Sequence, residues 1–121
     1  MLQSRSFGEA AYHESLVHPA MFAHKNPRRA AILGGGEGAT LREVLKHKTV
    51  EKVTMIDIDE EFVELARDHL SEWNDCSRIV GSTDCCFDDQ RAELLFVDAI
   101  RFFLDRPSDA EPFDIIVADV L

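Results

Sequence analysis

A glycine-rich run, Gly34–Gly38, most constrains how this chain can fold. It follows a short apolar segment, Ala30–Leu33, and precedes a helical pattern over Ala39–Lys48. Glycine lets a backbone turn sharply and approach a ligand that a Cβ would block, and unpaired N–H groups gather at a helix start. This order predicts the opening unit of an α/β nucleotide-binding fold. The G-x-G-x-x-A spacing alone is also compatible with a tight turn that binds nothing.

Short apolar runs alternate with helical patterns along the rest of the chain. The runs that predict buried strands are Ala30–Leu33, Val53–Ile58, Leu94–Val97 and Phe113–Val117. The segments that predict helices are Ala39–Lys48, Glu60–Trp73 and Ala99–Asp105. Alternation of this kind predicts a Rossmann-like α/β fold, with a parallel sheet and right-handed crossovers. Because the last run leads straight to Leu121, we expect a piece of a longer protein.

Charge and cysteine content narrow the possible partners. The 121 residues carry a formal net charge of -10, which disfavours a nucleic-acid partner. Neither a secretory signal nor an apolar run of membrane-spanning length is present in the sequence, so we expect a cytoplasmic protein without a membrane partner. The three cysteines, Cys76, Cys85 and Cys86, predict free thiols in a reducing compartment. The polar stretch Asn74–Gln90 predicts a surface insertion.

Three aspartates stand at predicted strand ends, namely Asp57, Asp98 and Asp119. Since the carboxyl ends of parallel strands share one edge of a sheet, we expect these side chains to line a common rim. Asp57 has the spacing at which a carboxylate holds ribose hydroxyls, and Asp98 could accept a hydrogen bond from an adenine amino group. The competing interpretation of Asp57 and of Asp98 is a helix cap, although Asp59 can cap the helix that follows Asp57.

Glu37 inside the glycine run argues against a dinucleotide. A carboxylate about 4 Å from a pyrophosphate charge costs on the order of 4 kcal/mol at an effective dielectric near 20. That repulsion favours a cationic nucleoside without phosphates, such as S-adenosylmethionine or a relative. Several carboxylates on one rim further indicate a polycationic substrate.

Motifs that carry a family resemblance extend over most of the chain. They are Leu2-Gln3-Ser4, Glu9, Tyr12-His13-Glu14, Ile32–Gly38, Leu41–His47, Val50–Val53, Ile56–Asp59, Val97–Ala99 and Phe113–Asp119. Together they resemble the spermidine/spermine synthase family, the polyamine aminopropyltransferases. Glu37 stands where that family commonly has Asp, which looks more like the thermospermine synthase branch.

The resemblance implies transfer of an aminopropyl group from decarboxylated S-adenosylmethionine to spermidine or putrescine, with release of methylthioadenosine. It implies that Asp119 accepts a proton from the attacking amine. The donor would be a co-substrate, with no prosthetic group and no metal, and the full-length protein would be a homodimer. The residues implied in donor and acceptor binding are Gln3, Tyr12, His13, Gly34, Gly36, Glu37, Gly38, Asp57, Asp98 and Ala99.

The resemblance also implies a domain organisation. Residues 1–14 would end a small N-terminal β-domain and its linker, and residues 15–121 would begin a Rossmann-like domain of the class I methyltransferase type, truncated after about four strands. Gly8 replaces an acidic residue common in the family just before Glu9.

Two other functions stay open from the sequence. A class I S-adenosylmethionine-dependent methyltransferase would share the glycine turn and the acid of the second strand, but it would not need Tyr12, His13 or Asp119. An inactive remnant of the family is the other. The remaining histidines, His18, His24, His47 and His69, are predicted to lie apart as surface or capping residues.

Overall fold

The computed structural model describes residues 7–120 of the chain. In chain order the elements are α1 (Glu9–Ala23), β1 (Arg29–Gly34), α2 (Ala39–Leu45), β2 (Lys52–Asp57), α3 (Glu60–His69), the 3-10 turn η1 (Cys86–Asp88), β3 (Ala92–Phe96), α4 (Ala99–Leu104) and β4 (Ile115–Asp119).

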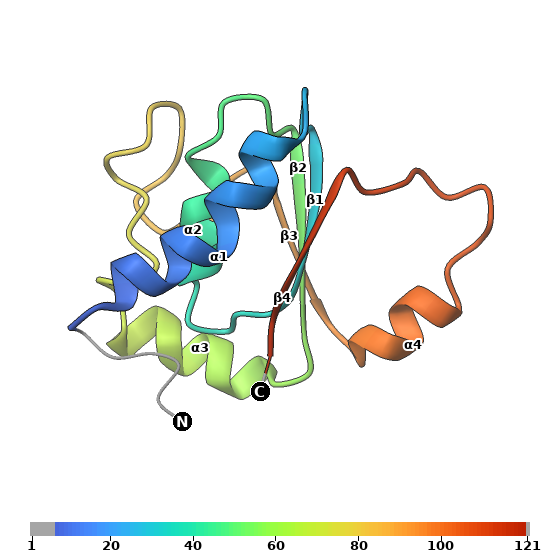
Figure 1. Ribbon diagram of the computed structural model, residues 1–121. Coiled ribbons are helices and arrows are strands. Elements are labelled where there is room, and N and C mark those ends of the chain that lie inside the picture. Colours follow the sequence, from blue (N-terminus) through green and yellow to red (C-terminus); the bar gives the residue numbers. More distant parts are fainter. Residues whose placement is uncertain (1–6, 121) are drawn as a thin grey trace.

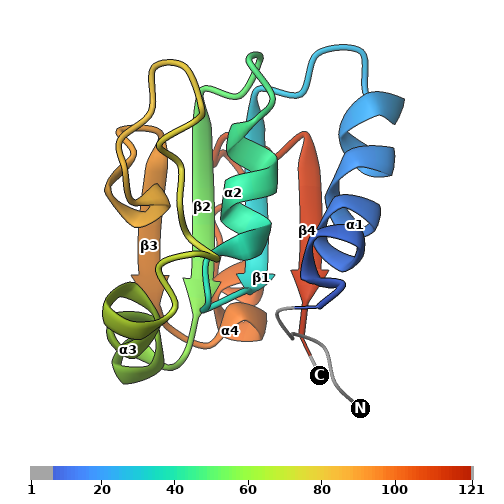
Figure 2. The ribbon, with the colours of Figure 1, turned by 90° about the vertical axis from the view of Figure 1, so that its left-hand side faces the viewer.

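The strands form one parallel sheet in the order β3-β2-β1-β4, which confirms the predicted α/β fold. All four strands point the same way (Figure 2). The last strand begins later than predicted and continues to Asp119. Its start is fixed by Asp114, whose carboxylate accepts the backbone N–H groups of Arg28 and Arg29.

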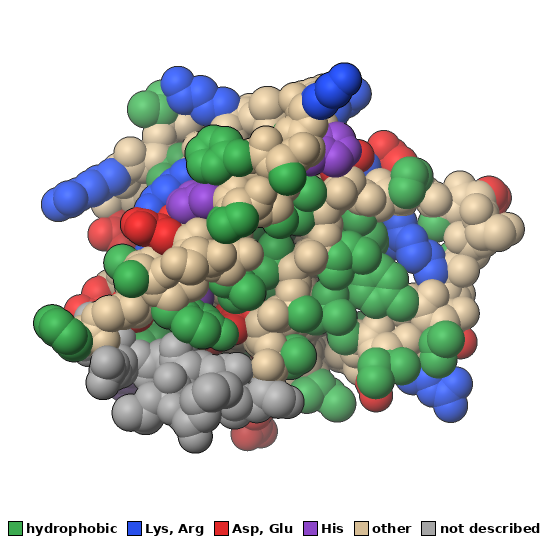
Figure 3. Space-filling view, in the orientation of Figure 1, with side chains coloured by type: hydrophobic (Ala, Val, Ile, Leu, Met, Phe, Trp, Pro, Cys, Tyr) green, Lys and Arg blue, Asp and Glu red, His purple; other side chains and the backbone are tan. Residues whose placement is uncertain are grey.

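Helices cover the two faces of the sheet unequally. Helices α1, α2 and α3 lie on one face and α4 on the other (Figure 1). The larger layer encloses the core, where Ile32, Leu41 and Met55 are almost fully buried. On the α4 side, apolar side chains gather at the surface (Figure 3), and Ile100, Leu104 and Ile116 are more than half exposed. Within the described residues, no helix has the length and apolar character needed to cross a membrane.

Helix α1 was not predicted from the sequence. It spans the expected boundary between residues 14 and 15, so a single element joins the predicted linker to the predicted domain. Its buried stripe consists of His13, Val17 and Met21, and Pro19 lies inside the helix. A histidine in the buried stripe and a proline within four residues of its end obscure the apolar periodicity that normally reveals a helix.

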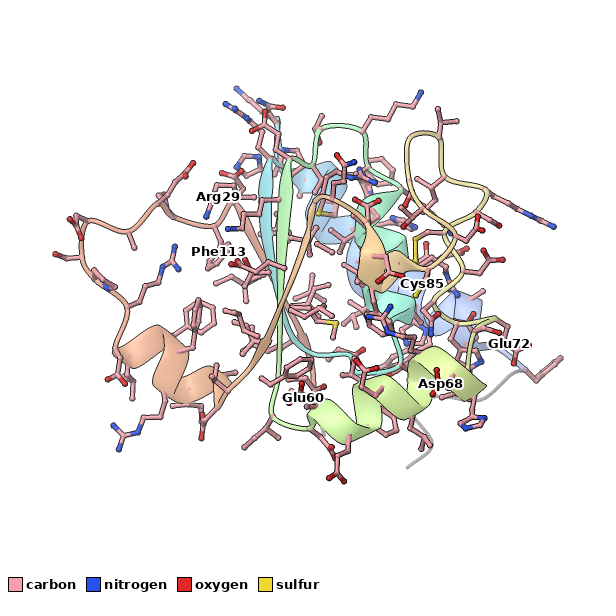
Figure 4. The ribbon with its side chains drawn as sticks, turned by 180° about the vertical axis from the view of Figure 1, so that it is seen from behind. Arg29, Glu60, Asp68, Glu72, Cys85 and Phe113 are labelled. Atoms are coloured by element: carbon pink, nitrogen blue, oxygen red, sulfur yellow. A yellow bond between two sulfur atoms is a disulfide. The ribbon has the colours of Figure 1, made fainter. Side chains whose placement is uncertain are left out.

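The segment 74–90 is not the predicted surface insertion, because part of it belongs to the core. Asn74, Cys76, Cys86 and Phe87 are buried. The prediction of three free thiols is also wrong, since Cys76 and Cys86 form a disulfide and Cys85 is the free cysteine. Backbone hydrogen bonds between residues 74–76 and 84–86 bring the two Cα atoms to 5.1 Å, within disulfide reach. Cys85 lies on the α2 and η1 side of the sheet (Figure 4).

Candidate functional site

The site lies where the connections of the sheet change direction. From β1 the chain crosses by α2 to β2 on one side, whereas β4 pairs with the opposite side of β1. In open α/β sheets, such a switch point leaves a crevice at the carboxyl ends of the strands. Gly34 at the end of β1 pairs in register with Asp119 at the end of β4. The pairing of the two strands therefore places Asp119 next to the glycine turn.

The glycine turn has room for backbone alone. Gly34 has φ +83°, and a Cβ there would lie 2.2 Å from the carbonyl oxygen of Asp119. Gly36 does not have a positive φ, but a Cβ on it would lie 2.7 Å from the Phe62 ring and 2.9 Å from Oδ2 of Asp57. The turn therefore packs directly against the backbone of Asp119 at the end of β4 and against the Asp57 carboxylate at the end of β2.

Asp119 is a buried carboxylate with hydroxyl donors. It is 7% exposed. Thr40 donates its hydroxyl hydrogen to Oδ2 at 2.6 Å, and the Tyr12 hydroxyl lies 3.4 Å from Oδ1. Burial raises the pKa of Asp119, and the nearby charge of Glu37 raises it further, while the hydrogen bond from Thr40 opposes the shift. A carboxylate with a raised pKa is a better proton acceptor than an ordinary surface Asp.

His13 reaches the same site from α1. It is fully buried, and its Nε2 lies 3.3 Å from Oε1 of Glu37. Its Nδ1 lies 2.8 Å from both the backbone oxygen and Oε2 of Glu9. Burial alone would lower the pKa of His13, but the hydrogen bonds to Glu37 and Glu9 outweigh it and raise the pKa.

Potential ligand atoms of His13, Glu37 and Asp119 all lie within 4.8 Å of one another. That spacing is compatible with a metal ion. However, Nε2 of His13 is directed at Glu37, and Thr40 and Tyr12 already donate to Asp119. Two carboxylates with hydroxyl and imidazole partners form the kind of polar cluster that can bind an ammonium group, whose charge and hydrogens need acceptors.

The ends of β2 and β3 extend this rim. Asp57 accepts the backbone N–H of Asp59, and Asp59 caps α3 as predicted, accepting from Phe62. Asp98 caps α4 through the backbone N–H groups of Ile100 and Arg101. Asp98 therefore acts as a helix cap, which was the alternative interpretation of this residue from the sequence.

Position along the sheet edge separates the predicted site residues into two groups. Tyr12, His13, Glu37 and Asp119 meet at the β1–β4 end, with Asp57 beside the glycine turn. Asp98 and Ala99 stand on β3's side, two strands further from Asp119 than β1 is. There an open hollow of about 410 Å³ lies between α4 and the following loop, lined in part by Asp98, Phe102 and Pro107. Gln3 lies outside the described residues.

Two histidines that were predicted to lie apart are paired. Nδ1 of His18 lies 2.8 Å from Nε2 of His47, and Nε2 of His18 lies 3.1 Å from Oε2 of Glu43. They meet because α1 packs along α2 and its continuation, an arrangement that a sequence without a predicted α1 could not suggest.

Comparisons with known proteins show which family the chain resembles. The family described as "Spermine/spermidine synthase domain" matches residues 9–121. Polyamine aminopropyltransferase 1 of Hyperthermus butylicus is 49% identical over 120 residues, which are 99% of this chain and 38% of the relative. The polyamine aminopropyltransferase of Aeropyrum pernix is 49% identical over 119 residues, covering 98% and 34%.

Solved structures give the same match. Spermidine synthase from Thermotoga maritima superposes with a TM-score of 0.78 at 39% identity, over 93% of this chain and 35% of that one. A spermidine synthase in complex with the transition state analogue AdoDATO gives 0.79 at 38% identity, over 93% and 34%. The chain therefore spans about a third of the length of these relatives.

Proposed function

This chain belongs to the spermine/spermidine synthase family, and we propose that it is the donor-binding and proton-accepting part of a polyamine aminopropyltransferase. The reaction moves an aminopropyl group from decarboxylated S-adenosylmethionine to the amine of putrescine or spermidine and releases methylthioadenosine. The observation that carries the proposal is the buried Asp119 carboxylate beside Glu37 and His13 at the switch point.

Asp119 is the proposed proton acceptor. An alkyl amine with a pKa of about 10 is protonated at neutral pH and has no lone pair for attack on carbon. Asp119, whose pKa is raised by burial, binds the ammonium and takes its proton. Tyr12 and Thr40 hold the carboxylate in place through their hydroxyls. The sulfonium is itself a good leaving group, and positioning the two substrates supplies much of the remaining rate enhancement.

The donor lies along the rim in this proposal. Asp57 holds the ribose hydroxyls through Oδ2, which already faces the glycine turn. Asp98 holds the adenine amino group with the oxygen that does not cap α4, and Ala99 lies at the same strand end. Glu37 sits near the aminopropyl amine. Because the turn carries a carboxylate, it suits a donor without phosphates.

For the whole protein, we propose further properties that the family resemblance implies. Gln3 is proposed to line the donor and acceptor pocket. Spermidine is the proposed acceptor, as in the thermospermine synthase branch. The full protein is proposed to be a homodimer located in the cytoplasm. The Cys76–Cys86 disulfide removes the argument that free thiols gave for a reducing compartment.

Product analysis of the full natural protein tests the reaction. Decarboxylated S-adenosylmethionine is supplied with putrescine or spermidine, and products are separated by mass. We expect methylthioadenosine together with an acceptor heavier by one aminopropyl group. Formation of S-adenosylhomocysteine from S-adenosylmethionine, without methylthioadenosine from the decarboxylated donor, would instead establish a methyltransferase.

A further inference from the structure

A buried series of charged side chains leads from the candidate site into the layer between α1 and α2. Glu37 contacts His13, His13 contacts Glu9, and Arg42 contacts Glu9 through both guanidinium ends at 3.0 Å. Arg42 also donates to Glu43 at 3.0 Å, and Glu43 is fully buried. The reaction steps above use neither Glu9 nor Arg42.

The contacts of His13 decide where its hydrogens are. Nδ1 lies 2.8 Å from a backbone carbonyl oxygen, which can only accept, so Nδ1 carries a hydrogen. Nε2 lies 3.3 Å from a carboxylate oxygen of Glu37, and an ionised carboxylate also only accepts. With Glu37 ionised, both ring nitrogens are donors and the ring is an imidazolium.

The groups around His13 favour that charge. From α1 it faces Glu9 and the edge of Tyr12, from the turn after β1 Glu37, and from β4 the charge of Asp119. The ring of Trp73 lies 6.2 Å away between centroids. Within the described part of the chain, the cation nearest in this network is Arg42, which pairs with Glu9 and not with the ring.

We propose that Glu9, held by Arg42, is a positioning residue that fixes His13 as an imidazolium directed at Glu37. This inference rests on the proposed function, since its consequence concerns the amine reaction. Glu9 is 14% exposed in its side chain, so its charge acts on His13 with little screening by water.

The arrangement gives the two carboxylates different roles. Glu37 is partly neutralised by His13, whereas the hydrogen bonds of Asp119 come from hydroxyls. During attack, an N–H bond of the amine breaks and an O–H bond forms on Asp119. The nitrogen lone pair forms the new N–C bond, and the electron pair of the breaking C–S bond goes to sulfur. With His13 neutral, its Nε2 lone pair would repel Glu37 and disturb the site.

Glu9→Gln and Glu9→Asp in the full natural protein separate charge from shape. Gln keeps the length and an acceptor for Nδ1–H but loses the charge, while Asp keeps the charge and is shorter. We expect Glu9→Gln to lower kcat about tenfold at pH 8 and much less at pH 6. Without the charge of Glu9, the imidazolium of His13 gives up its proton at a lower pH than in the wild type, so the ring is neutral at pH 8 and still protonated at pH 6. Glu9→Asp should stay closer to the wild type. Glu61→Gln, which removes an exposed carboxylate from α3, is the matched control.

Histidine NMR provides a readout that does not depend on turnover. The titration midpoint of His13 should move to lower pH in Glu9→Gln and stay put in Glu61→Gln. The inference is overturned if that midpoint is unchanged, if the rate ratio to wild type is the same at both pH values, or if Glu9→Asp loses as much as Glu9→Gln. A wild type that makes no methylthioadenosine contradicts the proposed function instead, and the NMR midpoint still decides the role of Glu9.

Discussion

At the scale of single residues, the end of the glycine turn shows how closely the site is packed. Gly38 has φ +88°, and a Cβ there would lie 2.6 Å from Cβ of Asn74 and 2.8 Å from the Phe87 ring. Both neighbours are buried, and Asn74 also donates to backbone oxygens of Ala66 and Leu70. The turn is therefore held from outside by the segment that follows α3.

Gly38→Ala should destabilise the protein by about 2–3 kcal/mol, since it combines an unfavourable φ with overpacking. Gly8→Ala is a close control, because Gly8 also caps a helix at φ +87° but a Cβ added there would meet nothing within 4 Å. That variant should lose about 1 kcal/mol from backbone strain alone. Urea unfolding measures both, and equal losses would show that contact with Asn74 and Phe87 is unimportant.

His13 also shows the limit of sequence-based prediction for single residues. Tyr12 and His13 could be predicted as site residues only from the family resemblance, because nothing in the spacing between residues 12 and 119 suggests that they are in contact. Their contacts depend on how α1 packs against α2 and β4, which the spacing of residues does not reveal. The contacts of Glu9 with His13 and Arg42 were missed for the same reason, although Glu9 stands four residues before His13, the spacing of neighbours on a helix.

At the scale of elements, the hairpin-like segment between α3 and β3 supports the site indirectly. The Cys76–Cys86 disulfide closes a loop with a sequence separation of 10 and places Phe87 against the turn. Replacing both cysteines by Ala should lower the free energy of unfolding by roughly 2–3 kcal/mol. Cys85→Ser, which leaves the disulfide intact, should have a much smaller effect. A double variant as stable as the wild type in thermal unfolding would argue against the bridge.

Asp89 stabilises the other end of that segment in a pH-dependent way. It is 4% exposed and bonded to Arg91 and Ser82. Burial alone would raise the pKa of Asp89, but the hydrogen bonds from Arg91 and Ser82 outweigh this effect and lower the pKa to about 2. Because the folded pKa lies below the unfolded one, its stabilisation is present above about pH 4 and disappears as pH falls towards 2.

Asp89→Asn should therefore cost about 2 kcal/mol at pH 7 and progressively less below pH 4. Urea unfolding of the variant and the wild type across that range measures the difference. A gap between the two proteins that is the same at pH 7 and pH 2.5 would show that the carboxylate charge is not what stabilises the segment.

The sequence allowed the four strands and three of the helices to be predicted because each strand is a short apolar run next to a turn signal. Prediction failed where burial did not follow hydrophobicity. Helix α1 buries His13, and the segment 74–90 buries Asn74 and a disulfide within a polar stretch. Of the site, the shared sheet edge followed from parallel topology, whereas contacts across α1 required the packed structure.

In the molecule as a whole, the order of the strands brings the residues of the candidate site together. The central strand β1 lies between β2 and β4, so the carboxylates of Asp57 and Asp119 flank the glycine turn although they are far apart in sequence. The net charge of -10 on these 121 residues would attract the proposed cationic substrates, and we expect this attraction to weaken as salt is added.

The proposed function depends above all on transfer of a proton from the attacking amine to the Asp119 carboxylate. The most direct measurement compares the rate of methylthioadenosine formation by wild type and Asp119→Asn at saturating substrates, in the full natural protein. We expect the rate to fall about 10²–10⁴-fold while circular dichroism shows that the fold is retained. Asn keeps the shape of the side chain and an acceptor for Thr40, but it cannot take a proton. A folded variant that forms methylthioadenosine at the wild-type rate would contradict this role of Asp119.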